Sequence, residues 1–183
     1  MRIALVLLPA LALAACSAQD EAEEPTAAQV AEAPEPGPKD MLDLQATGLT
    51  VPAQDGDETM EVPFGSQRAA AEATLAGVLG EATERVENSE CGAGPMQLTS
   101  YEGMVLHFQD GQFVGYTARA PYVPELSRED MLADPAVQMM DGSTLGEEFT
   151  IGSGDALISG LFDGAGAQAG ITTMWAGATC IFR

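Results

Sequence analysis

The dipeptide Asp110-Gly111 constrains the fold of this chain more than any other feature of its sequence. It separates two apolar runs, residues 103–109 and 112–118. An Asp-Gly pair between two such runs is a strong signal for a β-hairpin with a type I′ turn. The middle of the chain is therefore predicted to be an antiparallel hairpin.

A two-residue turn also fixes the register of this hairpin. Side chains alternate between the two faces of a strand, and both faces of this hairpin are mostly apolar. An antiparallel sheet with one face in water shows a cleaner alternation, so we expect the C-terminal third of the chain to cover part of the second face. The predicted pairs are Phe108 with Phe113, His107 with Val114, Leu106 with Gly115 and Val105 with Tyr116.

A helix is predicted shortly before the hairpin. Ser66 is a suitable N-cap residue, and Gly80 is a suitable C-terminal stop. The residues between them place one apolar stripe on the helix, which needs a sheet to cover it. The stripe consists of Ala71, Leu75, Val78 and Leu79.

The remaining segments complete an α+β fold: an antiparallel meander sheet packed by one main helix. Ser127 begins a second, short helix that Pro135 must end. Short strands are predicted at residues 41–49, 82–88, 96–101, 156–162, 171–175 and 178–183.

The N-terminus carries the features of an export signal. Met1-Arg2 is followed by the apolar run 3–13, which is too short to span a bilayer as a stable helix. The run ends in Leu13-Ala14-Ala15-Cys16, which resembles the lipobox of bacterial lipoproteins. The resemblance implies a signal peptide, cleavage before Cys16 and lipidation of its thiol, for example with palmitate. Ser17 after the cysteine implies an outer-membrane location facing the periplasm. An ordinary signal peptide or a buried N-terminal helix is the alternative.

This assignment divides the chain into three parts. Residues 1–15 are the signal peptide, and residues 16–40 are the lipidated cysteine with a disordered tether. The tether is acidic and rich in proline, and Pro34, Pro36 and Pro38 alternate in it. Residues 41–183 form a single folded domain.

The other two cysteines, Cys91 and Cys180, allow one pairing once Cys16 is lipidated. Such a pair usually closes in an exported protein, because the compartment is oxidising. We therefore predict a disulfide between Cys91 and Cys180.

The composition is strongly acidic, with 28 Asp and Glu against 7 Lys and Arg. A surface of this charge repels phosphate backbones, which excludes nucleic acid as a partner. It favours basic proteins or cations, or it serves solubility alone.

Catalytic and metal-binding patterns are weak. The single histidine, His107, cannot build a His-rich zinc site, and the chain has no Gly-x-Ser-x-Gly motif. The turn Asp55-Gly56-Asp57-Glu58 fails the EF-hand spacing, because Met60 stands where that loop needs glycine. No catalytic, cofactor-binding or metal-binding residue is predicted.

The segment Asn88-Ser89-Glu90-Cys91 faintly resembles the nucleophile segment of aspartate-semialdehyde dehydrogenases. The resemblance implies that a Cys91 thiolate attacks an aldehyde, with His107 as the base. However, that family opens with a nucleotide-binding glycine turn. The comparable glycines of this chain, Gly164, Gly166 and Gly170, lie near its end, so this activity is disfavoured.

Three dipeptides between residues 64 and 119 carry a second resemblance: Phe64-Gly65, Leu79-Gly80 and Asp110-Gly111. Their order is similar to the helix-then-sheet unit of BamE and of β-lactamase-inhibitor-protein-type secreted proteins. A degenerate second unit would begin at residues 141–146. The resemblance implies a scaffold or inhibitor surface that binds protein, with no catalytic residues.

Two functions follow from these patterns. The favoured one is a lipid-anchored, non-catalytic domain that binds an envelope protein or component through a sheet face or through residues 175–177. The alternative is an envelope enzyme or small-ligand-binding domain that uses acids and a tyrosine in a cleft. The candidate tyrosines are Tyr101, Tyr116 and Tyr122.

Overall fold

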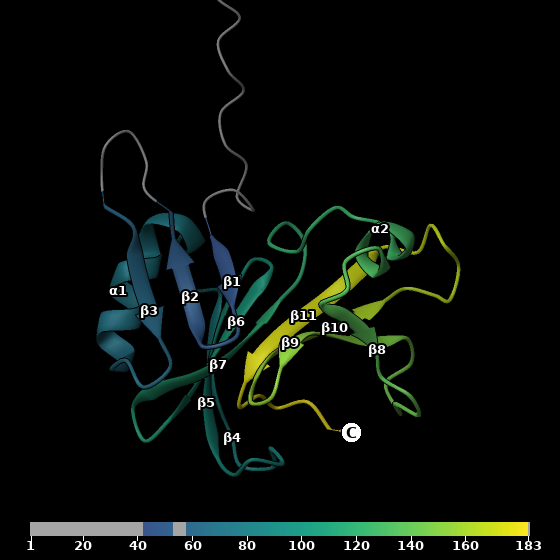
Figure 1. The fold of residues 1–183 in the computed structure, drawn as a ribbon. Coiled ribbons are helices and arrows are strands. Elements are labelled where there is room, and N and C mark those ends of the chain that lie inside the picture. Colours follow the sequence, from purple (N-terminus) through teal and green to yellow (C-terminus); the bar gives the residue numbers. More distant parts are fainter. Residues whose placement is uncertain (1–41, 53–57, 183) are drawn as a thin grey trace, which may run out of the picture. The chain divides into compact units, whose positions relative to one another are not determined.

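A computed structural model describes residues 42–52 and 58–182 of the chain. In these residues the protein is mostly antiparallel β-sheet with two short helices (Figure 1). The predicted signal peptide, the lipidation site at Cys16 and the tether lie outside the described residues. The same holds for Asp55, Gly56 and Asp57 of the rejected calcium turn.

A three-stranded sheet begins the described part. Its strands run in the order β1 (Asp43–Gln45), β2 (Gly48–Val51) and β3 (Met60–Pro63), and both pairings are antiparallel. The sequence predicted one short strand or an entry segment at residues 41–49. The chain instead turns at residues 46–47, so that Leu49 of β2 pairs with Leu44 of β1.

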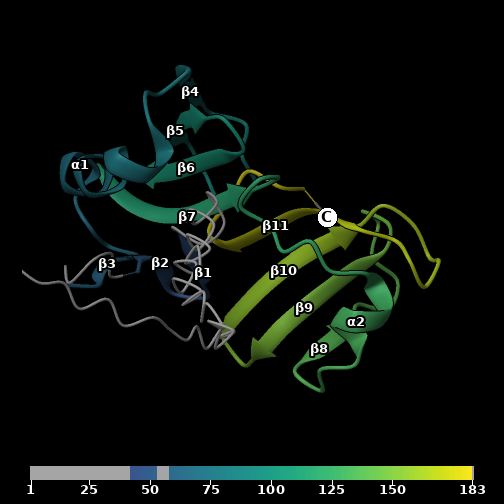
Figure 2. The same cartoon turned by 90° about the horizontal axis from the view of Figure 1, so that it is seen from above.

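The second sheet has eight strands, and every neighbouring pair in it is antiparallel. Figures 1 and 2 show β7 and β11 side by side in its middle. In spatial order the strands are β4 (Glu84–Asn88), β5 (Met96–Tyr101), β6 (Met104–Gln109), β7 (Gln112–Ala118), β11 (Ile171–Gly177), β10 (Ala156–Phe162), β9 (Glu148–Ser153) and β8 (Val137–Met139).

The predicted hairpin is confirmed, and its predicted register is wrong beyond the first pairs. Asp110 and Gly111 both have positive φ, 49° and 76°, as a type I′ turn requires. Phe108 pairs with Phe113 as predicted, but a β-bulge follows. One extra residue of β7 has no partner in β6 there, and pairing resumes after it. The observed pairs after the bulge are His107 with Gly115, Leu106 with Tyr116 and Val105 with Thr117.

Helix α1 (Arg68–Leu79) buries the predicted apolar stripe. Ala71, Leu75 and Leu79 are buried, and Val78 packs against the same core. The predicted stop is confirmed, because Gly80 has φ 72° and its N–H donates to the Ala76 carbonyl.

The predicted N-cap of α1 is wrong by one residue. Gln67 occupies that position without a capping hydrogen bond from its side chain, and the Ser66 hydroxyl donates to the Pro63 carbonyl instead. Ser66 is therefore used in the turn before the helix. The short helix α2 (Arg128–Leu132) starts as predicted, with the Asp130 N–H donating to Ser127 Oγ at 3.1 Å.

One hydrophobic core joins these elements. It contains the buried residues of α1 and of the small sheet together with aromatic residues from both halves of the large sheet. Phe108 and Phe113 lie in the half formed by β4–β7, and their ring centres are 5.9 Å apart. Phe149 and Phe162 lie in the half formed by β8–β11, at 4.4 Å.

The same order of elements occurs twice. Helix α1 is followed by β4–β7 and helix α2 by β8–β11, and each helix is preceded by an isolated β-bridge to the last hairpin of its half. Gln67 bridges Gln112, and Ser127 bridges Gly170. A bulge also interrupts the last hairpin of both halves, before Phe108 in one and before Phe162 in the other.

The first residue of each helix makes matching contacts. The guanidinium carbon of Arg68 lies 5.0 Å from the ring centre of Phe108, and that of Arg128 lies 5.9 Å from the ring centre of Phe162. Arg68 Nη1 donates to Gln97 at 3.0 Å, and Arg128 Nη2 lies 3.5 Å from a carboxylate oxygen of Glu147.

Candidate functional site

The strand registers place one unbroken row of cross-strand partners across the large sheet. The row lies on the opposite face from Gln97 and Thr99, which hydrogen-bond Arg68 of α1, so we call this side the open face. In spatial order the row is Glu84, Ser100, Val105, Thr117, Trp175, Ser159, Thr150 and Gln138.

Exposure along the row is graded. Glu84 and Gln138 at its ends are exposed, whereas Thr117, Trp175 and Ser159 at its centre are buried. Beside the row, Val86 on the edge strand β4 is 39% exposed, and its partner Leu98 is half-buried. The β4–β6 part of the open face is thus apolar, accessible and next to the carboxylate of Glu84.

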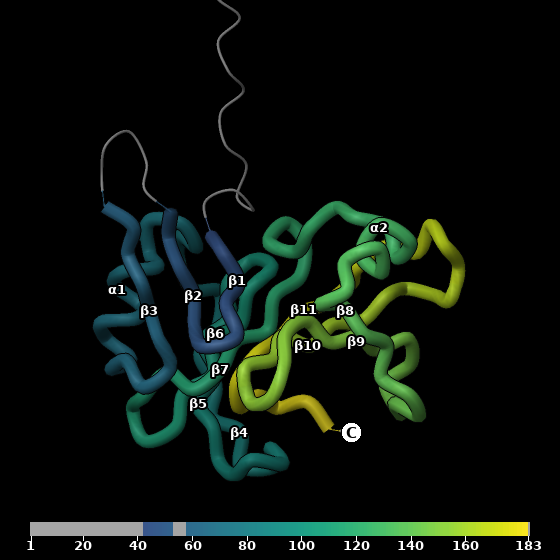
Figure 3. The backbone as a smooth tube through the Cα atoms, viewed as in Figure 1, coloured from purple at the N-terminus to yellow at the C-terminus, as the bar shows by residue number. Residues whose placement is uncertain are grey.

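The segment after β11 covers part of this face. A Cβ on Gly115, which would point to the open face, would collide with the Ala178 carbonyl oxygen. Cys180 is bonded to Cys91 at the start of the β4–β5 loop, and Asn88 Nδ2 lies 3.3 Å from Cys180 Sγ. Figure 3 shows this last segment turning away from β11 next to β4.

The predicted disulfide is therefore confirmed, and the predicted strand at 178–183 is wrong for its described residues. Gly177 has φ 73° and ends β11, and the bond to Cys91 then directs the chain over the sheet instead of along it. Most of the C-terminal third extends the sheet sideways, so only this short segment gives the cover that was expected from it.

His107 lies beneath this covered region and is buried there. It is 4% exposed, its Nε2 lies 3.0 Å from Thr117 Oγ1, and its Nδ1 has no hydrogen-bond partner. Burial lowers the pKa of His107 to about 4, because the charged imidazolium would lose its hydration. The ring is therefore neutral at neutral pH.

Cys91 cannot serve as the nucleophile of an aldehyde dehydrogenase in this structure. Its sulfur is bonded to Cys180, so no thiolate is present. Asn88, the other residue of that resemblance, instead directs its side chain to the disulfide.

The three candidate tyrosines are part of the core. Burial is the main cause that raises the pKa of Tyr101, Tyr116 and Tyr122 above the ordinary value. Tyr116 donates to the Gln45 carbonyl at 3.1 Å and Tyr122 to the Val78 carbonyl at 3.3 Å. Both hydroxyls are thus hydrogen-bonded to carbonyl groups of other elements of the fold.

The region at residues 175–177 was a predicted binding surface, but Trp175 is only 4% exposed. Its indole lies at the centre of the sheet, where it pairs across the strands with Thr117 and Ser159. An exposed tryptophan anchor is therefore not available there.

Sequence reasoning missed a charged network between α1 and β5. Thr99 Oγ1 donates to Glu72 at 2.7 Å, and Arg68 Nε donates to the same carboxylate oxygen at 3.0 Å. Burial alone would raise the pKa of Glu72, but these hydrogen bonds and the charges of Arg68 and Arg85 lower it below its ordinary value. The spacing of Arg68 and Glu72, four residues apart on a helix, was the available signal.

Sequence reasoning also missed Glu148, whose side chain is fully buried at the start of β9. Its carboxylate accepts a hydrogen bond from Ser143 Oγ.

No group of three or more His, Cys, Asp or Glu side chains within the described residues is arranged to hold a metal ion. In the same part of the chain, neither helix has the length and apolar character to cross a bilayer.

Comparison of the chain with protein-family models, with curated proteins and with solved structures gave no significant match.

Proposed function

We propose that this protein is a bacterial lipoprotein, anchored through Cys16 in the outer membrane and facing the periplasm. Its folded part would bind a protein or another envelope component without catalysis. The motif Leu13-Ala14-Ala15-Cys16 supports the anchor, and the Cys91–Cys180 disulfide is typical of an oxidising compartment such as the periplasm. The acidic surface disfavours binding to anionic lipid.

We further propose that the folded part consists of two copies of one unit, a helix followed by a four-stranded antiparallel meander. The repeated order of elements, the two matching β-bridges and the two arginine-on-phenylalanine contacts support this assignment. The resemblance to β-lactamase-inhibitor-protein-type units led us to expect a second unit, but at residues 141–146, which lie between β8 and β9; the second unit proposed here begins earlier, at α2. The second helix is shorter than the first, which explains why the repeat is hard to see in the sequence.

The β4–β6 part of the open face is the proposed binding surface, because the row of partners across the eight strands is buried at its centre and accessible at this end. Both units contribute to this row, which ends at an exposed residue on each side. Val86, Leu98 and Val105 give an accessible apolar patch beside acidic Glu84. Apolar patches rimmed by polar residues are characteristic of protein-binding surfaces.

A photo-crosslinking residue placed at Val86 in cells tests this function. Leu126 is a matched control, because it is exposed to a similar degree, 45% against 39%, and precedes α2. We expect a stoichiometric crosslinked partner from position 86 and none from position 126. Equal crosslinking from both positions, or from neither, would reject the open face.

The anchor has its own test. Metabolic labelling with palmitate should label the wild type and not a Cys16→Ser variant, which should be released from the membrane fraction. A wild-type chain that is unlabelled would reject the lipoprotein assignment, whatever the crosslinking shows.

A further inference from the structure

An apolar groove lies on the other face of the large sheet, away from the open face. Its volume is about 440 Å³. The side chains of Ile151 and Ile158, on paired strands β9 and β10, line it and are half-buried. The full lining is Leu42, Asp43, Leu44, Tyr122, Pro124, Ile151, Ile158 and Met174.

The length of the two helices explains why this groove exists. Helix α1 has 12 residues, whereas α2 has 5 and ends shortly before Pro135. The missing residues correspond to about two turns, or about 10 Å of helix. Leu75 and Leu79, which α1 buries in the core, lie in the part for which α2 has no counterpart.

Comparing equivalent positions in the two halves of the large sheet shows which residues of the second half have no helix packed on them. Met104 lies four residues before Phe108, and Ile158 lies four residues before Phe162. Met104 pairs with Tyr101, and both are buried in the core cluster that contains Leu75 and Leu79. Ile158 pairs with Ile151, and both remain accessible in the groove. The groove is thus the site that the end of a longer second helix would fill.

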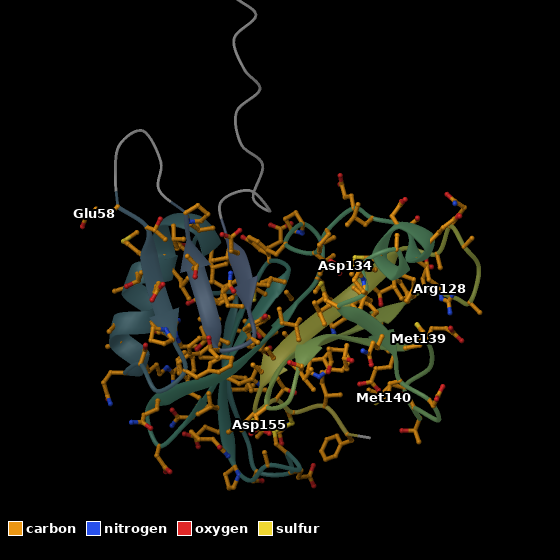
Figure 4. The ribbon with its side chains drawn as sticks, viewed as in Figure 1. Glu58, Arg128, Asp134, Met139, Met140 and Asp155 are labelled. Atoms are coloured by element: carbon orange, nitrogen blue, oxygen red, sulfur yellow. A yellow bond between two sulfur atoms is a disulfide. The ribbon has the colours of Figure 1, made fainter. Side chains whose placement is uncertain are left out.

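The charge at the groove indicates what kind of helix fits. Asp43 is exposed and belongs to the lining, which contains no basic residue. Asp155 lies in the turn between β9 and β10, next to the strand ends that carry Ile151 and Ile158 (Figure 4). Arg128, the first residue of α2, forms an ion pair with Glu147 and lies beside Phe162, at the other end of β10.

We propose that this groove binds a short amphipathic helix of a partner protein, about two turns long, with aliphatic residues four apart and basic residues beside them. The aliphatic face replaces the missing end of α2, and the basic residues complement Asp43 and Asp155. This is the helix-in-groove mode of recognition. The site is distinct from the open face, so it does not depend on the binding function proposed for that face.

The test uses synthetic peptides and the folded protein with its disulfide intact. The probe is a 14-residue helical peptide that repeats the spacing of Leu75 and Leu79 of α1 and carries lysine on its other face. One control peptide has the same composition with the leucines two apart, and another has glutamate in place of lysine. We expect saturable binding of the probe, weakened at least about tenfold in both controls and weakened by added salt.

Variants of the protein locate the binding site. Ile158→Gln should weaken the probe about tenfold, and Asp43→Asn, an exposed change that does not threaten the fold, about two- to threefold. Val86→Gln on the open face is the matched control and should leave affinity unchanged. The proposal fails if the probe binds no better than the control peptides, or if Val86→Gln weakens it as much as Ile158→Gln.

Discussion

Thr117 of β7 and Trp175 of β11 are direct cross-strand partners at the junction of the two halves of the large sheet. The pairs on either side of them are Tyr116 with Ala176 and Ala118 with Met174. Tyr116 pairs with Leu106 in the last hairpin of the first half, and Met174 pairs with Gly160 in the last hairpin of the second half. The two pairs occupy matching positions along the strands relative to the two bulges. The junction therefore relates the halves by a local two-fold arrangement centred on the Thr117–Trp175 pair.

Trp175 is the single tryptophan of the chain and reports on this junction. Because one core cluster contains residues of both halves, we expect the halves to unfold together. In urea, the red shift of tryptophan fluorescence should coincide with the loss of far-UV circular dichroism. A fluorescence midpoint clearly below that of circular dichroism would show that the junction opens before the halves unfold.

The Cys91–Cys180 disulfide closes a sequence separation of 89 residues. Loop-closure entropy predicts that Cys180→Ser lowers the free energy of unfolding by about 4–5 kcal/mol. The variant should also release the segment that lies over Gly115, so the pKa of His107 should rise from about 4 toward the ordinary value near 6.5. NMR titration of the imidazole measures the second effect, and an unchanged pKa in a folded variant would contradict the covering role of this segment.

His107 gives the protein a stability that depends on pH. Its pKa is about 4 in the folded state and near 6.5 when unfolded, so the unfolded chain takes up the proton more readily. The stabilising contribution is complete above pH 6.5, and about 3 kcal/mol of it is lost as the pH falls to about 4. Urea unfolding at several pH values should show this slope in the wild type and a shallower one in His107→Leu. Equal slopes would show that the carboxylates alone cause the acid sensitivity.

Local sequence signals predicted the parts of the fold that depend on neighbouring residues along the chain. Asp110-Gly111 set the turn, Gly80 ended α1, and the two available cysteines gave the disulfide. The bulge in β7 was not predictable in this way, because Gly115 passes against the backbone of Ala178, which is far away in the sequence.

The repetition of the two halves was hidden for a related reason. Its matched contacts preserve few residue types, chiefly an arginine at the start of the helix and a phenylalanine after the bulge. The spacing between them also differs, since Arg68 precedes Phe108 by 40 residues and Arg128 precedes Phe162 by 34. No fixed period was therefore available, and strands as short as β3 and β8 carried no alternating pattern of their own. The groove of the second half could be recognised only after the two helices were compared in space.

The second half of the large sheet has no counterpart of the hydrogen-bond network around Glu72. Leu132 stands in α2 where Glu72 stands in α1, four residues after the arginine, and Arg128 Nε is buried without a hydrogen-bond partner.

In the first half, Glu72→Ala would leave Arg68 Nε and the fully buried Thr99 hydroxyl without their acceptor. We expect this change to lower the free energy of unfolding by about 2–3 kcal/mol, and Glu72→Gln, which keeps an acceptor oxygen, to lower it by about 1 kcal/mol. Glu81→Ala, an exposed change just after α1, is the matched control and should have an effect near zero. Because the pKa of Glu72 is lowered, its contribution is present above pH 4.5 and is lost below it, so the difference between wild type and Glu72→Ala should shrink in acid. A loss as small as that of Glu81→Ala at neutral pH would show that the network does not hold α1 against β5.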